Sequence, residues 1–580
     1  MASSVKGESS TQESAKLSPV EHQKAVSNYL RGTLAAELAD TSLDHFNDLN
    51  KGLLKFHGSY QQEDRDARKN RDKTGVARSY IFMIRLKLPG GQLTADQYLA
   101  MDDICGRYAN GTLRITTRQS FQLHGVLKAN LKATMAAINE ALLTTLGACG
   151  DITRNVICCS APLPDAARAM MREHCQQVAQ ALTPQAARRA YHEIWLNGKP
   201  FTAECADEEP LYGKTYLPRK FKVAFALPHD NCTDLLAQCL GFLVVTDNGQ
   251  PHGRPIGYDL YCGGGQGQTN SRADTAPLLA QAIGFIEPDE VTEAAQAIVR
   301  LYRDHGNRAD RKRARLKYVV HDWGVNKFRE VFYRDYFPYP YRPPRGLPIS
   351  GVDLHHGWHG MGDGRWFLGL SVENGRIKDE GTLRLRSGIR AIVSRFRCDV
   401  RLTTQQDILL CGFHTNDRPV VENLLAEYGI PKPESLSLVQ RWSMACPAIP
   451  TCGLAITESE RALPHVIDQL EMVLQELGLQ DEPISVRMTG CPNGCARPYQ
   501  SDIGLVGRSG NKYTIYVGGD RLGRRLNQEL MDLVPVDQIV PRLVPLLRLY
   551  KQQRNPGESF GEFCTRLGPA VLRTHLENVN

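Results

Sequence analysis

An internal repeat limits this chain to a small set of folds. LRITTRQSFQLHG (113–125) aligns with VRLTTQQDILLCG (400–412), which begins 287 residues later, and six of the thirteen positions are identical. Each copy alternates apolar and polar residues, as a half-buried strand does. The period is far too long for a solenoid of stacked repeats. The repeat therefore predicts a duplicated architecture in which one module occurs twice.

The sequence around each copy supports a shared module. A further strand-like run precedes each copy, at 80–91 and at 366–377. Between the paired runs lie two segments, 95–111 and 382–396, whose patterns suit amphipathic helices. We therefore expect two α+β modules of about 80–90 residues each, a size typical of a small folding unit.

The two copies differ in the residues that carry charge. Arg118 aligns with Gln405 and His124 with Cys411, so the first copy has cations where the second has none. Four cysteines that form two spaced pairs all lie in the second half. The pattern predicts that one half binds an anion and the other a metal.

Segments outside the modules also predict mixed α/β structure. The stretch 461–479 is patterned as an amphipathic helix, with Gly478 placed to end it. The proline-rich stretch 337–348 is the predicted linker between the halves. The expected strands outside the modules are FKVAFALP, GFLVVTDNG, PISVRMTG, SDIGLVG and YTIYVGGD.

Composition limits the class of protein. A chain of 580 residues exceeds a single core, so we expect several domains. No apolar stretch is long enough for a transmembrane helix, and residues 1–18 predict a disordered tail rather than a secretory signal. Sixteen cysteines are too sparse for a disulfide scaffold, which favours reduced thiols and a cytoplasmic location. The net charge of +7 is too small to indicate nucleic acid by itself.

Four of the cysteines form a candidate metal site. Five residues separate the first pair, thirty-eight lie between the pairs, and three separate the second pair. Four thiolates suit either an iron–sulfur cluster or a structural zinc ion, and the spacing alone does not decide between them. The remaining alternative is four unrelated buried thiols. The four residues are Cys446, Cys452, Cys491 and Cys495.

Basic residues recur on the strands that lie next to glycine-rich loops. In YLPRKFK (216–222), Lys220 and Lys222 share one face of a strand, and two buried ammonium groups need an anion between them. The loop YCGGGQGQ (261–268) offers backbone amides to an anion, although it matches no dinucleotide motif. The basic run 306–318 is interpreted as a solvated helix face. The residues alone thus predict a metalloprotein with a polyanion site.

The motifs together resemble those of the sulfite and nitrite reductases that contain sirohaem. SMACPAIPTC (443–452) and TGCPNGC (489–495) resemble the cluster signature of that family. In the first half, RITTRQSFQLHG, TRNVICCS and YLPRKFK resemble its other motifs. Segments 27–34 and 55–68 are similar to the N-terminal region of the haemoprotein (beta) subunits that work with NADPH. The resemblance runs from about residue 20 to the C-terminus.

The resemblance implies the cofactors and the residues that hold them. It implies a 4Fe–4S cluster on the four cysteines, with Cys495 also bound to the sirohaem iron. Sirohaem is a polycarboxylate, which gives the scattered cations an ionic partner. The residues expected to bind the haem are Cys495, Arg114, Arg118, Gln122, His124, Arg219 and Asn493. The residues expected around the substrate are Arg85, Arg154, Lys220 and Lys222.

The resemblance also implies the fold and the reaction. The fold is α+β, a pseudo-two-fold duplicated sulfite/nitrite reductase fold with ferredoxin-like modules and two mixed α/β cofactor-binding domains. The reaction is the six-electron reduction of sulfite to sulfide, in sulfate assimilation and cysteine biosynthesis. Lys222 favours sulfite, since the family's nitrite reductases commonly have asparagine there. The departures from the family pattern lie in 262–280 and 496–500 and leave the haem contacts of those loops open.

Partners and alternatives follow from the same resemblance. The expected electron donor is the NADPH-dependent flavoprotein (alpha) subunit, and the alternative is ferredoxin. A metal-stabilised nucleic-acid-binding module is the more distant alternative, supported only by the basic run and the net charge. The predicted domains are a tail (1–18), an N-terminal arm that contacts the partner (19–75), half-module 1 (76–150), a sirohaem and substrate domain (151–336), a linker with half-module 2 (337–435) and a cluster domain (436–580).

Overall fold

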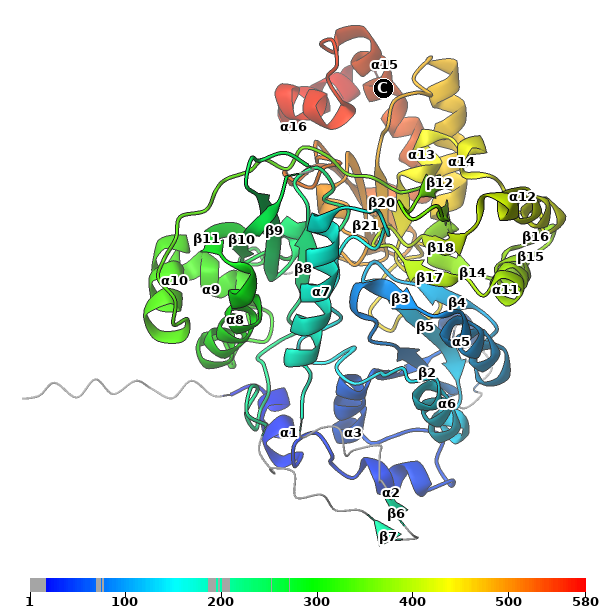
Figure 1. Ribbon diagram of the computed structural model, residues 1–580. Helices are drawn as coiled ribbons and strands as arrows, with labels where there is room; N and C mark the ends of the chain where they lie inside the picture. The colour runs from blue at the N-terminus through cyan, green and yellow to red at the C-terminus, as the bar shows by residue number, and fades with distance from the viewer. Residues whose placement is uncertain are drawn as a thin grey trace, which may run out of the picture.

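A computed structural model gives the fold of the protein (Figure 1). It describes residues 17–68, 75, 78–185, 195–196, 199–200, 209–251, 253–270 and 272–579. Helices and sheets are mixed throughout, which confirms the α+β prediction. Most of the predicted disordered tail lies outside the described residues. The helix α1 (Pro19–Val26) begins directly after it.

Two five-stranded antiparallel sheets confirm the duplication. The first has the order β1–β2–β5–β4–β14 and the second β12–β13–β18–β17–β3. The strands of the first sheet are β1 (Ser59–Glu63), β2 (Tyr80–Arg85), β5 (Phe121–Val126), β4 (Leu113–Ile115) and β14 (Arg376–Ile377). Those of the second are β12 (Gly357–Gly360), β13 (Trp366–Leu370), β18 (Ile408–Phe413), β17 (Asp399–Leu402) and β3 (Gln92–Leu93). The helices of the two modules are α5 (Ala95–Tyr108), α6 (Lys128–Glu140), α11 (Leu385–Phe396) and α12 (Arg418–Glu427).

The two modules exchange their edge strands. The short β3 leaves the first module and pairs with β17 of the second, while β14 leaves the second and pairs with β4 of the first. Side chains repeat the exchange: Gln119 donates to the carbonyl of Leu402 (3.0 Å), and Gln406 donates to that of Ile115 (3.4 Å). Gln119 and Gln406 are equivalent in the repeat, so the contact between the modules has pseudo-two-fold symmetry.

Glycines permit this close approach of the two backbones. Gly91 and Gly375 precede the exchanged strands at equivalent places, with φ of +70° and +72°. A Cβ on Gly91 would lie 2.5 Å from the Leu402 carbonyl oxygen, and one on Gly375 2.2 Å from that of Ile115. Any other residue at either place would clash with backbone and strain its own φ.

Two further large sheets lie in the green region and in the yellow-to-red region of Figure 1, in addition to two small two-stranded sheets among the described residues. The four-stranded sheet, in order β11–β10–β9–β8, has β8 (Val223–Ala226), β9 (Leu240–Thr246), β10 (Pro255–Cys262) and β11 (Gln281–Ile286). Its helices are α7 (Ala166–Ala181), α8 (Val291–His305), α9 (Leu316–Trp323) and α10 (Val325–Val331). The C-terminal sheet has β19 (Ser443–Ala445), β20 (Val486–Thr489), β21 (Ile503–Ser509), β22 (Lys512–Val517) and β23 (Gln528–Pro535). Its helices are α13 (Leu438–Arg441), α14 (Leu463–Glu476), α15 (Ile539–Gln553) and α16 (Phe560–Val579).

The helix predicted at 461–479 is α14. Its buried residues include Ile467, Leu470 and Leu474, which the periodicity placed on the apolar face. Gly478 lies just beyond the helix with φ of +66°, as expected of a residue that ends a helix. The predicted linker 337–348 is confirmed as a segment with neither helix nor strand.

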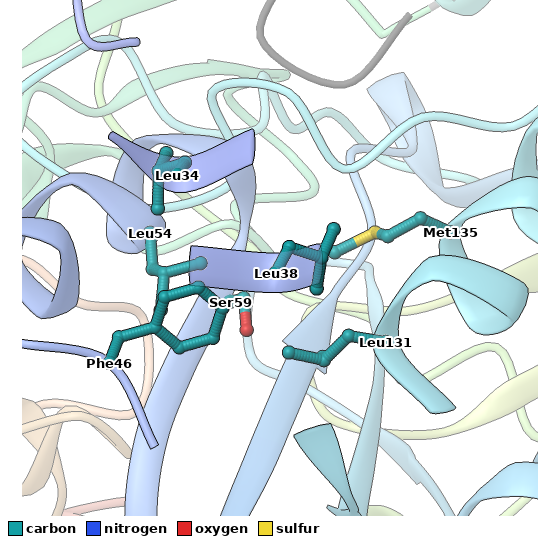
Figure 2. A pocket seen from close by; sticks show the side chains of 7 residues that line it. All are labelled: Leu34, Leu38, Phe46, Leu54, Ser59, Leu131 and Met135. Atoms are coloured by element: carbon teal, nitrogen blue, oxygen red, sulfur yellow. The ribbon is translucent and has the colours of Figure 1, made fainter. Parts of the chain in front are cut away.

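The N-terminal segment packs closely on the first module. Strand β1 is an edge strand of the first sheet, and α2 (Leu34–Ala39) faces α6 across a small apolar pocket (Figure 2). The pocket is lined by Leu34, Leu38, Phe46, Leu54, Ser59, Leu131 and Met135. Burial of this apolar surface holds the N-terminal segment against the module.

The interpretation of residues 306–318 as a solvated helix face is wrong. Helix α9 begins only at Leu316, and several of the cations turn inward. Arg311 forms two hydrogen bonds with the buried carboxylate of Asp151, at 2.7 and 3.0 Å. Lys317 is 1% exposed and Arg315 is 7% exposed. The end of the run, 314–318, is therefore buried, whereas Lys312 is exposed and Arg308, Arg311 and Arg313 are partly exposed.

Candidate active site

Two parallel strands bring the cysteine pairs together. Cys446 directly follows β19 and Cys491 comes soon after β20, and these strands pair in parallel register. The Cys446 amide donates to the Met488 carbonyl at 3.2 Å, and the Gly490 amide lies 3.4 Å from the Cys446 sulfur. Asn493 Nδ2 donates to the Cys491 sulfur at 3.3 Å.

The spacing of the four thiols favours a cluster over a single metal ion. Four sulfurs around one zinc ion lie about 3.8 Å apart, given a Zn–S distance of about 2.3 Å. Among the described residues, the one group of three or more such ligand atoms within 4.8 Å of one another contains none of these four cysteines. A polynuclear iron–sulfur cluster fits the wider arrangement.

The electrostatics of the thiols also fit a cationic cluster. Burial raises the pKa of Cys491 to about 11, and the neighbouring thiols of Cys495 and Cys452 raise it further while Asn493 opposes them. Burial, and then the charge of Cys495, raises the pKa of Cys446. The protein by itself therefore disfavours four thiolates here. A bound metal cluster supplies the positive charge that makes them stable.

The predicted substrate cations meet at the seam between the first half and the cysteine loops. Arg154 and the segment 219–222 are neighbours, because the Arg154 amide donates to the Phe221 carbonyl at 2.9 Å. Arg154 is buried and also binds the carbonyl of Gly150 through Nε at 3.0 Å. Arg85 ends β2. The thiol of Cys495 raises the pKa of Arg85 and of both lysines, so these three cations lie within its electrostatic reach.

The two lysines face other cations rather than carboxylates. Burial, and then the charges of Arg315 and Arg219, lowers the pKa of Lys220 to about 7. Burial, and then Arg118 and Lys220, holds the pKa of Lys222 well below its usual range. Cys495 is the main opposing influence on both. Such a group is a binding site for an anion that supplies the missing negative charge.

Arg85, Gln122 and His124 form one hydrogen-bonded row. Arg85 and Gln122 are paired across β2 and β5. With its amide oxygen turned towards the guanidinium, Gln122 accepts from Arg85 Nε at 2.8 Å and donates to His124 Nε2 at 3.2 Å. Burial, followed by the charges of Arg114 and Arg85, holds the pKa of His124 well below its usual range, so its ring is neutral. Arg85 also donates to the Cys149 sulfur at 3.0 Å.

The other predicted haem ligands differ in how they are paired. Arg118 donates to Gln238 and to the Val223 carbonyl, both at 2.9 Å, and its Nε has no hydrogen-bond partner. Burial lowers its pKa to about 9. Arg219 lies 3.7 Å from Asp151. Arg114 is ion-paired with Glu460, but its Nε has no hydrogen-bond partner, and burial, followed by the charge of Arg376, lowers its pKa to about 9.

Several residues beside the site were not predicted from the sequence. Lys317 donates to the carbonyls of Gly265 (3.2 Å) and Gly267 (2.7 Å) in the glycine-rich loop. This loop in turn touches the cysteine loop, since the Gln268 amide donates to the Pro492 carbonyl at 3.0 Å. Arg315 is buried with an unpartnered Nε. The alternation of cations in RARLK (313–317) was the available signal.

Arg497 organises the loop after Cys495. Its guanidinium donates to the carbonyls of Thr117 (3.2 Å) and Thr404 (2.9 Å), which are equivalent residues of the two repeats, and it is ion-paired with Asp234. The Thr117 hydroxyl also donates to the Cys495 carbonyl at 3.0 Å. Both modules therefore hold the backbone that carries Cys495. The segment 496–500 thus links this loop to both repeats.

These residues fit the two expected cofactors. Arg118 Nε, Arg315 Nε and His124 Nδ1 are buried polar atoms without hydrogen-bond partners, and buried donors of this kind call for an acceptor. A polycarboxylate such as sirohaem supplies acceptors and negative charge together. When bound, sirohaem supplies the iron that binds the substrate, and the 4Fe–4S cluster supplies electrons.

Comparisons with known proteins decide the family. The family model described as nitrite and sulphite reductase 4Fe-4S domain matches residues 179–340 and 444–579, and the ferredoxin-like half domain of these reductases matches 77–141 and 359–428. The chain belongs to the nitrite and sulfite reductase family. The two half-domain matches fall on the duplicated modules, and the other model spans both cofactor-binding regions.

Curated relatives match along nearly the whole chain. A sulfite reductase (ferredoxin) of Synechococcus elongatus is 43% identical over 97% of this chain and 91% of its own length. A sulfite reductase (NADPH) hemoprotein beta-component of Paenibacillus is 42% identical over 95% of both chains. The solved structure of the NirA protein of Mycobacterium tuberculosis has a TM-score of 0.77 and 25% identity, covering 96% of this chain and 98% of its own.

Membership in this family decides between the sequence-based alternatives. Sirohaem and a 4Fe–4S cluster are the cofactors of this family, so the four thiols bind a cluster rather than a zinc ion. The hypothesis of a nucleic-acid-binding module is wrong, because the family consists of reductases. Within the described residues, no helix has the length and apolar character needed to cross a membrane.

Proposed function

We propose that this chain is the haemoprotein subunit of an assimilatory sulfite reductase, which reduces sulfite to sulfide with six electrons. The observation that carries the proposal is the clustering of Arg154, Lys220 and Lys222, which the hydrogen bond from the Arg154 amide to the Phe221 carbonyl brings together. A small anion with several oxygens suits such a group, because arginine forks bind oxygens in pairs and lysines add point charge. The relatives named as sulfite reductases support this choice of substrate.

The roles of the side chains follow from their charge and surroundings. Arg85 and Arg154 each present a planar fork of N–H donors, so they bind and orient the sulfite oxygens. Lys220 and Lys222 suit proton donation, because an ammonium group that anions keep protonated can pass a proton to an oxygen as it leaves. Each S–O cleavage places negative charge on an oxygen that leaves as water. Cations fixed in advance around that oxygen stabilise the charge as it develops.

Electrons would come from a separate protein. We propose the NADPH-dependent flavoprotein subunit as donor, in the cytoplasm, supported by the relatives named as hemoprotein beta-components. The second candidate donor is ferredoxin, favoured by the 43% identity to the Synechococcus protein.

Anaerobic turnover tests substrate and donor together. Sulfite and nitrite are each supplied to the purified protein, once with a flavoprotein donor and NADPH and once with reduced ferredoxin. We expect stoichiometric sulfide from sulfite and faster turnover with the flavoprotein. Faster turnover with ferredoxin would establish the second candidate. A kcat/KM for nitrite above that for sulfite would contradict the proposed substrate.

A further inference from the structure

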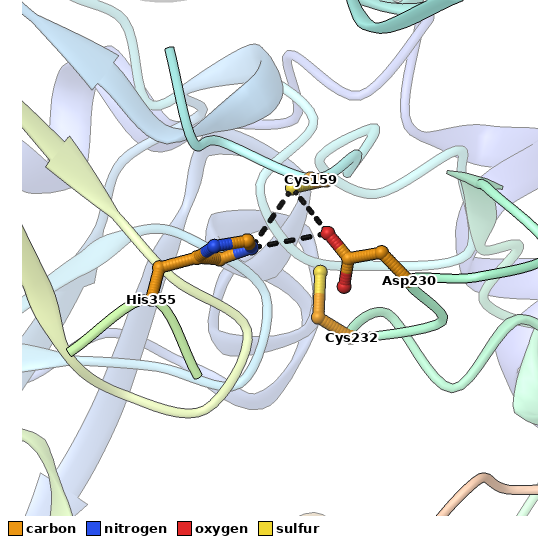
Figure 3. Close-up of side chains that lie close together, drawn as sticks. All are labelled: Cys159, Asp230, Cys232 and His355. Atoms are coloured by element: carbon orange, nitrogen blue, oxygen red, sulfur yellow. Dashed lines mark hydrogen bonds and ion pairs between the residues drawn. The ribbon is translucent and has the colours of Figure 1, made fainter. Parts of the chain in front are cut away.

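A second group of ligand-type side chains lies apart from the cysteine loops. Its members are Cys159, Asp230, Cys232 and His355. All four are buried, and their ligand atoms all lie within 4.8 Å of one another (Figure 3). Below, this group is called the Cys–Asp–Cys–His cluster. Nothing in the reductase reaction accounts for it.

Three separate segments build the cluster. Cys159 follows the strand-like run that contains Arg154, and Asp230 and Cys232 lie in the loop after β8. His355 lies in the segment that connects the two halves, with φ of +57°. A left-handed φ is unfavourable for a histidine, so the surrounding structure holds this residue in place. Figure 3 shows the imidazole directed at the Cys159 sulfur and the Asp230 carboxylate.

The distances match those of a tetrahedral metal site. The Cys159 sulfur lies 3.0 Å from Asp230 Oδ2 and 3.3 Å from His355 Nε2, and these last two atoms are 3.0 Å apart. Ligands of a zinc ion lie about 3.3–3.8 Å from each other, given Zn–S and Zn–N distances of about 2.3 and 2.0 Å. Shifts of a few tenths of an ångström would therefore place an ion between these atoms.

The surroundings match a metal site in orientation and in charge. His355 Nδ1 lies 3.4 Å from the carboxylate of Asp353 without a hydrogen bond to it, so a small movement would give it the carboxylate partner that orients metal-bound histidines. Arg168 donates to Asp230 Oδ2 at 3.0 Å. Two thiolates and the Asp230 carboxylate carry a charge of −3, which a divalent ion and the Arg168 guanidinium would offset, while the adjoining carboxylates of Asp165 and Asp353 are partly or fully exposed to solvent. Pairing of the buried charges in this way avoids the cost of an unpaired ion.

We propose that the Cys–Asp–Cys–His cluster binds a structural zinc ion. Two sulfurs with one nitrogen and one oxygen in a closed tetrahedral set suit zinc better than harder or redox-active ions. Binding displaces the protons of both thiols to solvent and leaves no position open for substrate. The ion joins the segment before β12, which carries His355, to the segment after Arg154 and to the loop after β8. Its role is to hold the two halves in register.

Metal analysis and zinc X-ray absorption on the holoenzyme test this proposal. We expect about one zinc ion per chain, with two sulfurs at about 2.3 Å and two lighter ligands at about 2.0 Å. Iron is measured in the same sample, since about five irons per chain show that the cluster and haem sites are filled with iron. Zinc in a fully iron-loaded protein cannot then occupy the cluster cysteines. Absence of zinc at full iron loading would overturn the proposal.

Matched cysteine variants locate the ion. Cys232→Ser should lose the zinc while keeping its iron, and it should have a lower thermal midpoint. Cys175→Ser is the control, because Cys175 is equally buried in α7 but lies outside the cluster, and it should keep the zinc. Retention of zinc by Cys232→Ser with unchanged zinc–sulfur coordination would overturn the assignment. So would a Cys159–Cys232 disulfide in non-reducing peptide mapping of the wild-type holoenzyme.

Discussion

Lys220 and Lys222 illustrate how single residues carry the chemistry of this protein. They lie two positions apart, each beside further cations, and burial lowers the pKa of both. The ammonium group of a surface lysine is stabilised by water, whereas that of a desolvated lysine needs an anion to stay charged. In the proposed function these two residues bind the substrate and supply protons, so a change at one of them should alter substrate choice without disturbing the fold.

Lys222→Asn should shift preference from sulfite towards nitrite. The change removes one charge, and sulfite, which carries more negative charge than nitrite, loses more stabilisation in its transition state. We expect kcat/KM for sulfite to fall on the order of 100-fold, with a smaller loss for nitrite. Steady-state kinetics with both substrates measure the ratio. Lys214→Asn, at an exposed lysine of the same segment, should leave the ratio unchanged. An equal loss for both substrates would contradict a selective role for Lys222.

Ion pairs with the buried carboxylate of Asp151 hold the basic segment 308–317 in place. Asp151 is 2% exposed, and Arg311, Arg219 and Lys24 all lie within 4 Å of its carboxylate. Burial alone would raise the pKa of Asp151, but these cations outweigh burial and hold it below its usual range. The carboxylate thus fixes the segment that carries Arg315 and Lys317.

Asp151→Asn should destabilise the protein most at neutral pH. Removing one partner of a buried ionic network leaves its cations uncompensated and costs about 3 kcal/mol. Because the native pKa is lowered, the contribution is complete above the unfolded value of about 4 and is lost as pH falls through the native value. The difference in thermal midpoint between wild type and variant should therefore shrink below about pH 4. Asp335→Asn, at an exposed ion pair, should have little effect at any pH. A difference that grows on acidification would contradict the pKa shift.

At the level of elements, sequence patterns predicted local structure and missed long-range contacts. The alternation in the repeat predicted β4–β5 and β17–β18, and helical periodicity predicted α14, because both depend on neighbours in the chain. The exchange of β3 and β14 was not predictable, since each is two residues long and pairs with a strand of the other module. Spacing also reveals Cys446 and Cys491 as a motif. It cannot reveal Cys159 and His355, which lie in separate segments far apart in the sequence.

Arg497 joins the parts of the whole molecule at the pseudo-two-fold axis. It binds the same carbonyl in each repeat, that of Thr117 and that of Thr404, and pairs with Asp234 of the four-stranded-sheet region. No shorter or single-headed cation can make these contacts together, since only a guanidinium has donors in several fixed directions. A lysine at position 497 would keep the positive charge but should not form all of these contacts.

Arg497→Lys should weaken cofactor retention. Loss of two buried hydrogen bonds costs about 2 kcal/mol and loosens the loop that carries Cys495. Sirohaem content per chain and the thermal midpoint should both fall. Arg525→Lys is the control, because Arg525 also binds two carbonyls, those of Gly518 and Gly519, but within the C-terminal region alone. It should keep its haem. Full sirohaem content in Arg497→Lys would show that the contacts of Arg497 are not needed for sirohaem binding.

The concentration of cations makes the stability of the whole molecule depend on its cofactor and on pH. In the cofactor-free chain, Lys220 and Lys317 have pKa values of about 7 and about 6, far below the value of about 10.4 for an unfolded lysine. Between these limits the unfolded state binds protons that the native state does not. The free energy of unfolding should then rise with pH, by up to about 1.4 kcal/mol per pH unit for each group.

The thermal midpoint should therefore rise with alkaline pH in the cofactor-free form but not in the holoenzyme. We expect the thermal midpoint of the cofactor-free chain to increase from pH 7 to pH 9, as the lysines stay neutral in the native state alone. In the holoenzyme, the haem carboxylates keep these lysines protonated, so the increase should disappear. Sulfate should also raise the midpoint of the cofactor-free chain more than chloride at equal ionic strength, because it can occupy the cation group. Identical pH profiles for the two forms would show that these cations do not serve the haem.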